Sequence, residues 1–205
     1  MKKKSIPIFV VLIFSYLISF AQKTDSVTLE VNTVESRELL DYYRFEGIDY
    51  FNMQASGENI KDQYFILSSM TYWNGKLTKV DTFANTKIYR MKNGTDTLGI
   101  RVMSKKTDSD TIKFQFNLPR FSTTRKFPTT QKNTYSLRDI TSNDANTFVA
   151  NDPINLLVYS LPYEDPERPG YLFYCELSRE GTPPEQWGEK FGIEHYIIFK
   201  LQLID

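Results

Sequence analysis

The sequence predicts an all-β protein built from two antiparallel sheets, a β-sandwich of the immunoglobulin-like or jelly-roll-like kind. Three observations predict it: runs in which apolar and polar residues alternate, turn residues between those runs, and aromatic residues that make up 15% of the chain. A closed up-and-down barrel of lipocalin type is the alternative, because the early strands follow one another in series. The long stretch in mid-chain favours the sandwich, since Greek-key connections return over the end of the sheets.

The first 21 residues are predicted to be a cleavable signal peptide. Three lysines, Lys2 to Lys4, precede an apolar run from Ile6 to Phe20, and the small residues Ser19 and Ala21 fit cleavage before Gln22. The run is shorter than the roughly 20 apolar residues that a membrane-spanning helix needs, and it contains a proline. We therefore expect export to the periplasm or to the cell surface.

Residues 22–205 are expected to form a single sandwich domain with no membrane span. Their length suffices for one sizeable core. The chain carries 25 basic and 25 acidic residues, and cleavage removes three lysines, so acids then outnumber bases by three. This balance argues against a nucleic-acid partner. The single cysteine, Cys175, cannot form an internal disulfide.

The mature chain begins with a strand, a short helix and a second strand. Apolar residues alternate with polar ones at 27–31, which is the period of a half-buried strand. Residues 36–43 are predicted to form one or two turns of helix with Ser36 as the N-terminal cap. Alternation returns at 50–55 and predicts another strand.

Two Asn-Gly pairs, Asn74-Gly75 and Asn93-Gly94, lie between β-patterned runs. A type I′ turn requires positive φ at both central residues, and Asn-Gly adopts it at low cost, so the pair is a strong hairpin signal. We therefore predict two hairpins made of four successive strands. A fifth strand at 111–118 places its large apolar residues on one face and extends this meander.

The segment 119–134 changes character. It is rich in Thr and Ser and has no acidic residue, and its basic residues are Arg120, Arg125, Lys126 and Lys132. We predict a solvated loop whose local charge could attract an anion or an acidic glycan. Strands resume at 154–161, 171–177 and 193–203, separated by two proline-bearing loops.

No catalytic residue is assigned from the sequence. Cys175 and His195, the only cysteine and the only histidine, would face each other if 171–177 and 193–203 formed a hairpin, and could then act as nucleophile and base. Nothing fixes that register, and apolar neighbours keep a thiol neutral, so we interpret both as buried core residues. The sequence has no serine-hydrolase elbow, phosphate-binding glycine loop or metal-ligand set, and we predict no cofactor and no metal.

The remaining candidates are aromatic and basic side chains outside the strands. Trp73 adjoins the first Asn-Gly turn, and Tyr163 and Trp187 lie in the proline-bearing loops, where aromatic rings can anchor a partner or stack on a ligand. The predicted binding residues are Trp73, Tyr163, Trp187, Arg120, Arg125 and Lys126. They indicate a non-enzymatic module whose partner is a protein or a glycan. The alternatives are a hydrolase that uses paired carboxylates and a small-ligand carrier with a barrel cavity.

Two segments, GIDYFNMQASGEN (residues 47–59) and FGIEHYIIFKLQLID (residues 191–205), resemble stretches of small exported bacterial proteins of unknown role. The SFAQ motif at residues 19–22 resembles the end of signal peptides from Gram-negative bacteria. The resemblance implies export and brings no functional residue with it.

Overall fold

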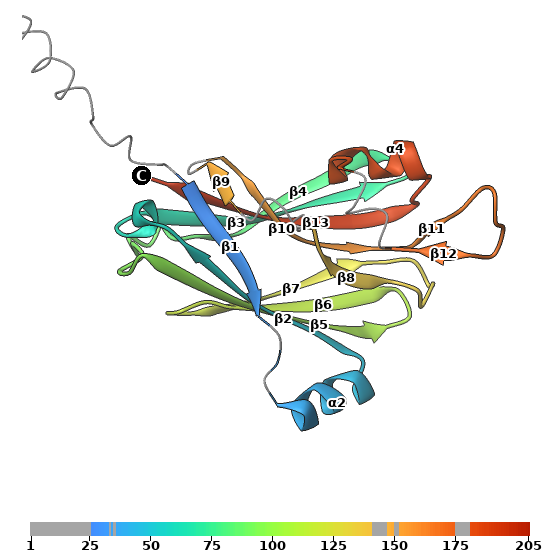
Figure 1. Ribbon diagram of the computed structural model, residues 1–205, viewed down its shortest axis with the longest axis horizontal. Helices are drawn as coiled ribbons and strands as arrows, with labels where there is room; N and C mark the ends of the chain where they lie inside the picture. Colours follow the sequence, from blue (N-terminus) through green and yellow to red (C-terminus); the bar gives the residue numbers. More distant parts are fainter. Residues whose placement is uncertain (1–25, 33, 35, 141–146, 150–151, 175–180) are drawn as a thin grey trace, which may run out of the picture.

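The computed structural model describes residues 26–32, 34, 36–140, 147–149, 152–174 and 181–205. The described chain is mostly β-structure, arranged as two large antiparallel sheets that lie one above the other (Figure 1). The sheets do not close into a barrel. The β-sandwich prediction is confirmed, and the lipocalin-type barrel is wrong.

The first sheet, sheet A, consists in spatial order of β7 (Ser122–Pro128), β6 (Thr111–Asn117), β5 (Thr97–Asp108), β2 (Ile48–Ser56), β1 (Ser26–Asn32) and β9 (Thr147–Val149). The second, sheet B, consists of β4 (Lys76–Asn85), β3 (Tyr64–Trp73), β13 (His195–Ile204), β10 (Ile154–Ser160) and β8 (Ser136–Asp139). A separate hairpin pairs β11 (Tyr163–Glu164) with β12 (Leu172–Phe173).

Short helices lie outside both sheets. They are α2 (Arg37–Phe45), η1 (Glu58–Ile60), η2 (Pro184–Gln186) and α4 (Trp187–Phe191). The predicted first helix is confirmed as α2, and the backbone N–H of Leu39 donates to Oγ of its cap, Ser36, at 3.2 Å. Within the described part of the chain, no helix has the length and apolarity to cross a membrane.

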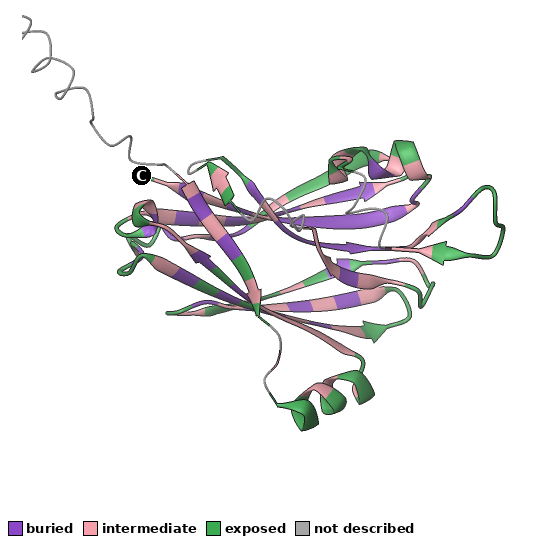
Figure 2. Cartoon of the chain, viewed as in Figure 1, coloured by how far each residue is buried: buried purple, intermediate pink, exposed green. Residues whose placement is uncertain are grey.

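Aromatic side chains from the two sheets meet in the core. The ring of Phe199 on β13 lies 4.6 Å from Phe114 and 5.3 Å from Phe116, both on β6, and 5.7 Å from Phe127 on β7. The alternation of each strand turns these rings inward, so purple buried positions alternate with pink and green ones along the sheets in Figure 2. Each buried ring contributes about 1.5–3 kcal/mol of transfer free energy.

The first predicted hairpin is confirmed. Asn74 and Gly75 connect β3 to β4 with φ values of 49° and 75°, as a type I′ turn requires. Glycine at this position also permits the backbone of α4 to approach closely, as described below.

The second predicted hairpin, at Asn93-Gly94, is wrong. The preceding strand belongs to sheet B and the following strand to sheet A, so this connection crosses between the sheets. The Asn93 side-chain amide donates to the carbonyls of Thr95 and Thr97, and its backbone N–H donates to that of Gln63. These bonds supply hydrogen-bond partners for the buried amide of Asn93. In an exposed hairpin turn, the same amide would be in solvent. The strand predicted at 86–92 is also wrong, because these residues form turns, and the other four predicted strands, β3 to β6, are divided between the two sheets.

The predicted loop at 119–134 is wrong in its central part, which forms the edge strand β7. Phe127 is buried on the inner face, while Thr124 and Lys126 are exposed on the outer face. The β-branched threonines that suggested a polar loop also suit an edge strand. The predicted strand at 171–177 contributes only β12, and residues 175–177 lie outside the described residues.

A second, smaller core covers the outer face of sheet B near the β3–β4 turn. Trp187, which is 2% exposed, lies there near the stacked rings of Tyr72 and Tyr196. Its indole N–H donates to the Thr182 carbonyl at 3.0 Å. Gly188 packs so closely that an added Cβ would lie 2.3 Å from Cα of Gly75.

The contact between α4 and the β3–β4 turn predicts that Gly188→Ala destabilises the fold. The new methyl group would meet backbone that cannot rotate away, and overpacking of this kind costs about 1–3 kcal/mol. Urea unfolding measures the change in the free energy of unfolding. Gly99→Ala is the matched control, because its Cβ has nothing within 4 Å, and we expect a change below about 0.5 kcal/mol. Equal stability of the two variants would contradict the packing described here.

Candidate functional site

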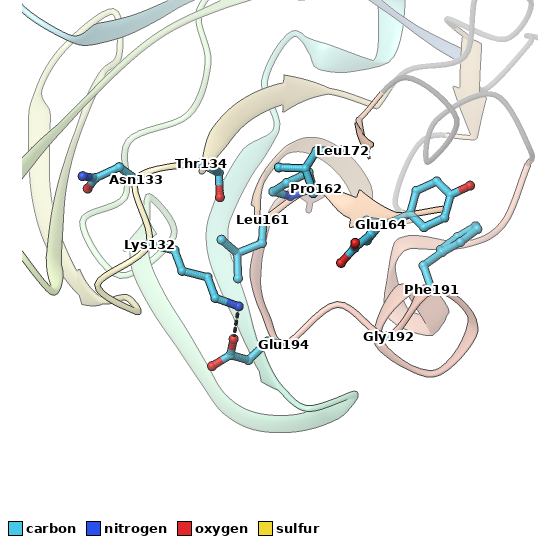
Figure 3. A pocket seen from close by; sticks show the side chains of 11 residues that line it. Lys132, Asn133, Thr134, Leu161, Pro162, Glu164, Leu172, Phe191, Gly192 and Glu194 are labelled. Carbon is cyan, nitrogen blue, oxygen red and sulfur yellow. Dashed lines mark hydrogen bonds and ion pairs between the residues drawn. The ribbon is translucent and has the colours of Figure 1, made fainter. Parts of the chain in front are cut away.

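A pocket of about 460 Å³ opens at the end of the sandwich near α4 (Figure 3). Three segments form it: the turn before β8, the β11–β12 hairpin with the residues that precede it, and the connection from α4 into β13. Its lining residues are Lys132, Asn133, Thr134, Leu161, Pro162, Tyr163, Glu164, Leu172, Phe191, Gly192 and Glu194. We call this the hairpin pocket.

One wall of the hairpin pocket is aromatic. The rings of Tyr163 and Phe191 lie 5.3 Å apart between centroids, and the ring of Phe173 lies 6.0 Å from that of Tyr163. Gly192, in a left-handed conformation, ends α4 and turns the chain into β13. This turn places Phe191 against the hairpin.

The facing wall is polar. Nζ of Lys132 lies 2.7 Å from a carboxylate oxygen of Glu194, the ion pair drawn as a dashed line in Figure 3. Both side chains are about half exposed, so solvent screens the pair. Asn133 and Thr134 add hydrogen-bonding groups beside it. The hairpin pocket thus combines an aromatic surface with donors and acceptors.

Local hydrogen bonds hold the tip of the β11–β12 hairpin. The Asp165 carboxylate accepts from the backbone N–H of Glu167 and from the Arg168 guanidinium, and these two bonds lower the pKa of Asp165. A Glu164 carboxylate oxygen accepts from the backbone N–H of Gly170 at 2.7 Å. These hydrogen bonds therefore hold in place the hairpin that carries Tyr163, one ring of the aromatic wall.

A second pocket, of about 350 Å³, adjoins the first and opens between the two sheets. Lys132 and Asn133 line both pockets and form the wall between them. Lys106 on β5 holds this wall in place. Its ammonium group donates to the carbonyls of Thr130 and Lys132 and to Oδ1 of Asn133. We call it the inter-sheet pocket.

Asp49 is the acidic residue that lines the inter-sheet pocket. Burial raises the pKa of its carboxyl group, and hydrogen bonds from the Ser104 hydroxyl and the Leu137 backbone oppose that shift. Burial also raises the pKa values of Tyr135 and Tyr159, whose stacked rings line the same pocket. The tyrosine hydroxyls therefore keep their protons at neutral pH.

His195 is fully buried at the start of β13, beside the wall between the pockets. Its Nδ1 lies 2.7 Å from the hydroxyl of Tyr135, which also accepts the N–H of Thr130. Burial lowers the pKa of His195 to about 4, so the ring is neutral at physiological pH.

The predicted binding residues do not gather in one place. Tyr163 lines the hairpin pocket, whereas Trp73 packs against His195 with ring centroids 4.0 Å apart and ring planes tilted by 39°. Trp187 is buried under α4 instead of exposed at a loop tip, because its indole completes the small core of sheet B.

The basic residues of 119–134 are likewise dispersed. Arg120, which follows β6 in the chain, lines a separate small crevice. Arg125 faces inward and joins the sheets, donating to the Phe83 carbonyl and lying 3.8 Å from the Asp81 carboxylate. Lys126 points outward from sheet A, and Lys132 belongs to the hairpin pocket. The four basic residues therefore lie at different places and do not form one anion site.

The hypothetical pairing of Cys175 with His195 also needs correction. Both edges of β13 are occupied, by β3 and β10, and the residue opposite His195 is Trp73. A hairpin between β12 and β13 is therefore excluded. Cys175 itself lies outside the described residues.

Sequence reasoning missed Phe191 and Glu194 as members of the site. A phenylalanine before a helix-ending glycine and a single acid before a buried strand carry no distinctive signal. Among the residues that the structure describes, no group of three or more His, Cys, Asp and Glu side chains could hold a metal ion. No protein-family model, curated protein or solved structure matches the chain.

The buried His195 predicts a defined pH dependence of stability. Above pH 6.5 the ring is neutral in both states; between pH 6.5 and 4 the unfolded chain takes up a proton that the native ring does not. Stability therefore falls as the pH falls through this window. The histidine alone accounts for a loss of about 3 kcal/mol by pH 4.

His195→Gln provides the comparison, because glutamine does not titrate and His195 is the only histidine in the chain. Urea unfolding from pH 7 to pH 4 should show a shallower loss of stability in the variant. Parallel profiles for the two proteins would contradict the buried, neutral state of the ring.

Proposed function

We propose that this protein is an exported, non-enzymatic binding module that holds a glycan or a protein segment in the hairpin pocket. The observation that carries the proposal is the pairing of an aromatic wall, Tyr163 and Phe191, with a polar wall that contains Lys132 and Glu194. The volume of the hairpin pocket lies within the range of about 300–1,000 Å³ that is typical of ligand sites.

The two walls match the two kinds of surface on a sugar ring. The aromatic faces can stack on the C–H face of the sugar, and the side chains of Lys132 and Glu194 can bond to hydroxyl groups at its edge. An extended peptide with an apolar side chain offers the same combination. Hydrogen bonds already hold the tip of the hairpin, so less conformational entropy is lost when the site binds a ligand.

A carboxylate hydrolase is the second candidate, because Glu164 and Glu194 line the same pocket. Glu194 is already paired with Lys132, and Glu164 accepts from the Gly170 backbone. These bonds give both carboxylates structural partners, and binding without catalysis is the simpler account. The barrel-cavity carrier is not proposed, since the sheets do not form a barrel.

The binding proposal predicts that Tyr163→Ala and Phe191→Ala each weaken ligand capture. Loss of one stacking ring should reduce affinity roughly 5–100-fold, the equivalent of about 1–3 kcal/mol. Arrays of bacterial-envelope glycans and of envelope-derived peptides, probed with the labelled protein, identify the ligand, and calorimetry then measures each variant.

Tyr171→Ala is the matched control, because Tyr171 is an exposed tyrosine of the same hairpin that does not line the pocket. Its affinity should equal that of the unmodified protein. If neither array gives binding that depends on Tyr163, the pocket proposal fails. If the captured glycan is cleaved and Glu194→Gln stops cleavage, the hydrolase replaces the binding module.

Export is proposed on the layout of residues 1–21. Expression of the full chain in a Gram-negative host should give a periplasmic or secreted product whose N-terminus is Gln22, measured by intact-mass and N-terminal analysis. Replacing Lys2, Lys3 and Lys4 with glutamate should slow processing, because the positive segment orients the signal peptide. A cytosolic product that retains residues 1–21 would contradict export.

A further inference from the structure

The outer face of sheet A carries a row of three lysines that lies outside the hairpin pocket. Lys105 on β5 lies opposite Lys113 on β6, and Lys113 lies opposite Lys126 on β7. Adjacent strands are about 4.8 Å apart, so three like charges follow one another across the sheet at that spacing. Like charges directly opposite each other on neighbouring strands destabilise a sheet.

Most of this charge is not compensated within the protein. Lys105 forms an ion pair with Glu46 at 2.8 Å. In the part of the chain that the structure describes, neither Lys113 nor Lys126 has an acidic partner. The nearest acids along the chain, Asp108 and Asp110, accept hydrogen bonds from neighbouring threonines at the β5–β6 turn.

The residues around the row on β5, β6 and β7 carry little negative charge. Asp108, at the turn end of β5, is the acid of these three strands, and the other outward residues include Arg101, Gln115 and Asn117. The Gln115 amide already donates to Asn117, so these side chains form a hydrogen-bonding strip beside the charges. Amides both donate and accept, which suits hydroxyl groups.

We propose that the outer face of β5, β6 and β7 is a second binding surface, for a linear acidic polysaccharide with a carboxylate on each sugar. Charge complementarity selects the anion: Lys113 and Lys126 supply uncompensated charges in a row across the strands. The amide strip supplies partners for the hydroxyl groups of the sugars. This surface uses no residue of the hairpin pocket, so it stands independently of the function proposed for that pocket.

The binding test uses the full mature chain and polygalacturonate as the probe, with neutral dextran as the ligand control. Affinity electrophoresis at several salt concentrations should show retardation by polygalacturonate that weakens as salt rises. The variant K113Q/K126Q should lose most of the retardation. Its slope of log affinity against log salt should fall by roughly 1.5, since each removed charge contributes about 0.7–0.9.

K76Q/K79Q is the matched control, because Lys76 and Lys79 are exposed lysines of β4, on the other sheet. It loses the same net charge and should bind as the unmodified protein does. K113Q/K126Q should keep an unchanged or higher thermal midpoint, because the substitutions remove a repulsion. A midpoint that falls would mean that the lysines serve the fold, and the proposal would fail.

Two other outcomes would overturn the proposal. Equal loss of binding by K113Q/K126Q and K76Q/K79Q would show that net charge alone attracts the polysaccharide. Binding to vesicles containing phosphatidylglycerol, with no binding to polygalacturonate, would assign the face to a membrane surface. Tyr163→Ala should leave polygalacturonate binding intact, so failure of the pocket and failure of this face can be told apart.

Discussion

The aromatic contact between the sheets is the interaction on which the rest of the structure depends. Phe199 of sheet B packs against three phenylalanines of sheet A and sets the separation of the layers. Toward the end of the sandwich this packing gives way to polar side chains, including Asp49, Tyr135 and Tyr159. The inter-sheet pocket lies at that transition, where a carboxyl group and tyrosine hydroxyls line the space between the sheets.

The alternation of apolar and polar residues sufficed to predict the sandwich. Any strand with one buried face shows this pattern in its sequence, whichever sheet it belongs to. The pattern could not assign strands to sheets. The segment after β4 carries a strong turn dipeptide, yet Asn93 bonds to Gln63, which precedes β3 of sheet B, and to Thr97, the first residue of β5 in sheet A, and the chain crosses over. Local turn chemistry was overridden there by hydrogen bonds to residues distant in sequence, which no local pattern reports.

The site was less predictable than the fold for the same reason. Tyr163 could be proposed because an aromatic residue in a proline-bearing loop is unusual, but its partner Phe191 is 28 positions away along the numbered chain. Lys132 and Glu194 are separated by 62 positions and meet only because β8 and β13 belong to one sheet. The lysine row depends on the register of three strands, and a shift of one residue would scatter it.

The place of β13 in sheet B has a consequence for how the molecule assembles. This strand joins β3 to β10, yet the residues it pairs with on β3 precede it by more than a hundred positions. Until β13 has been made, β3 and β4 have no neighbour linking them to β10 and β8, and the contacts of Phe199 with sheet A are missing. Closure of so long a loop slows folding, and the apolar strands made before β13 lack their partner until that strand follows.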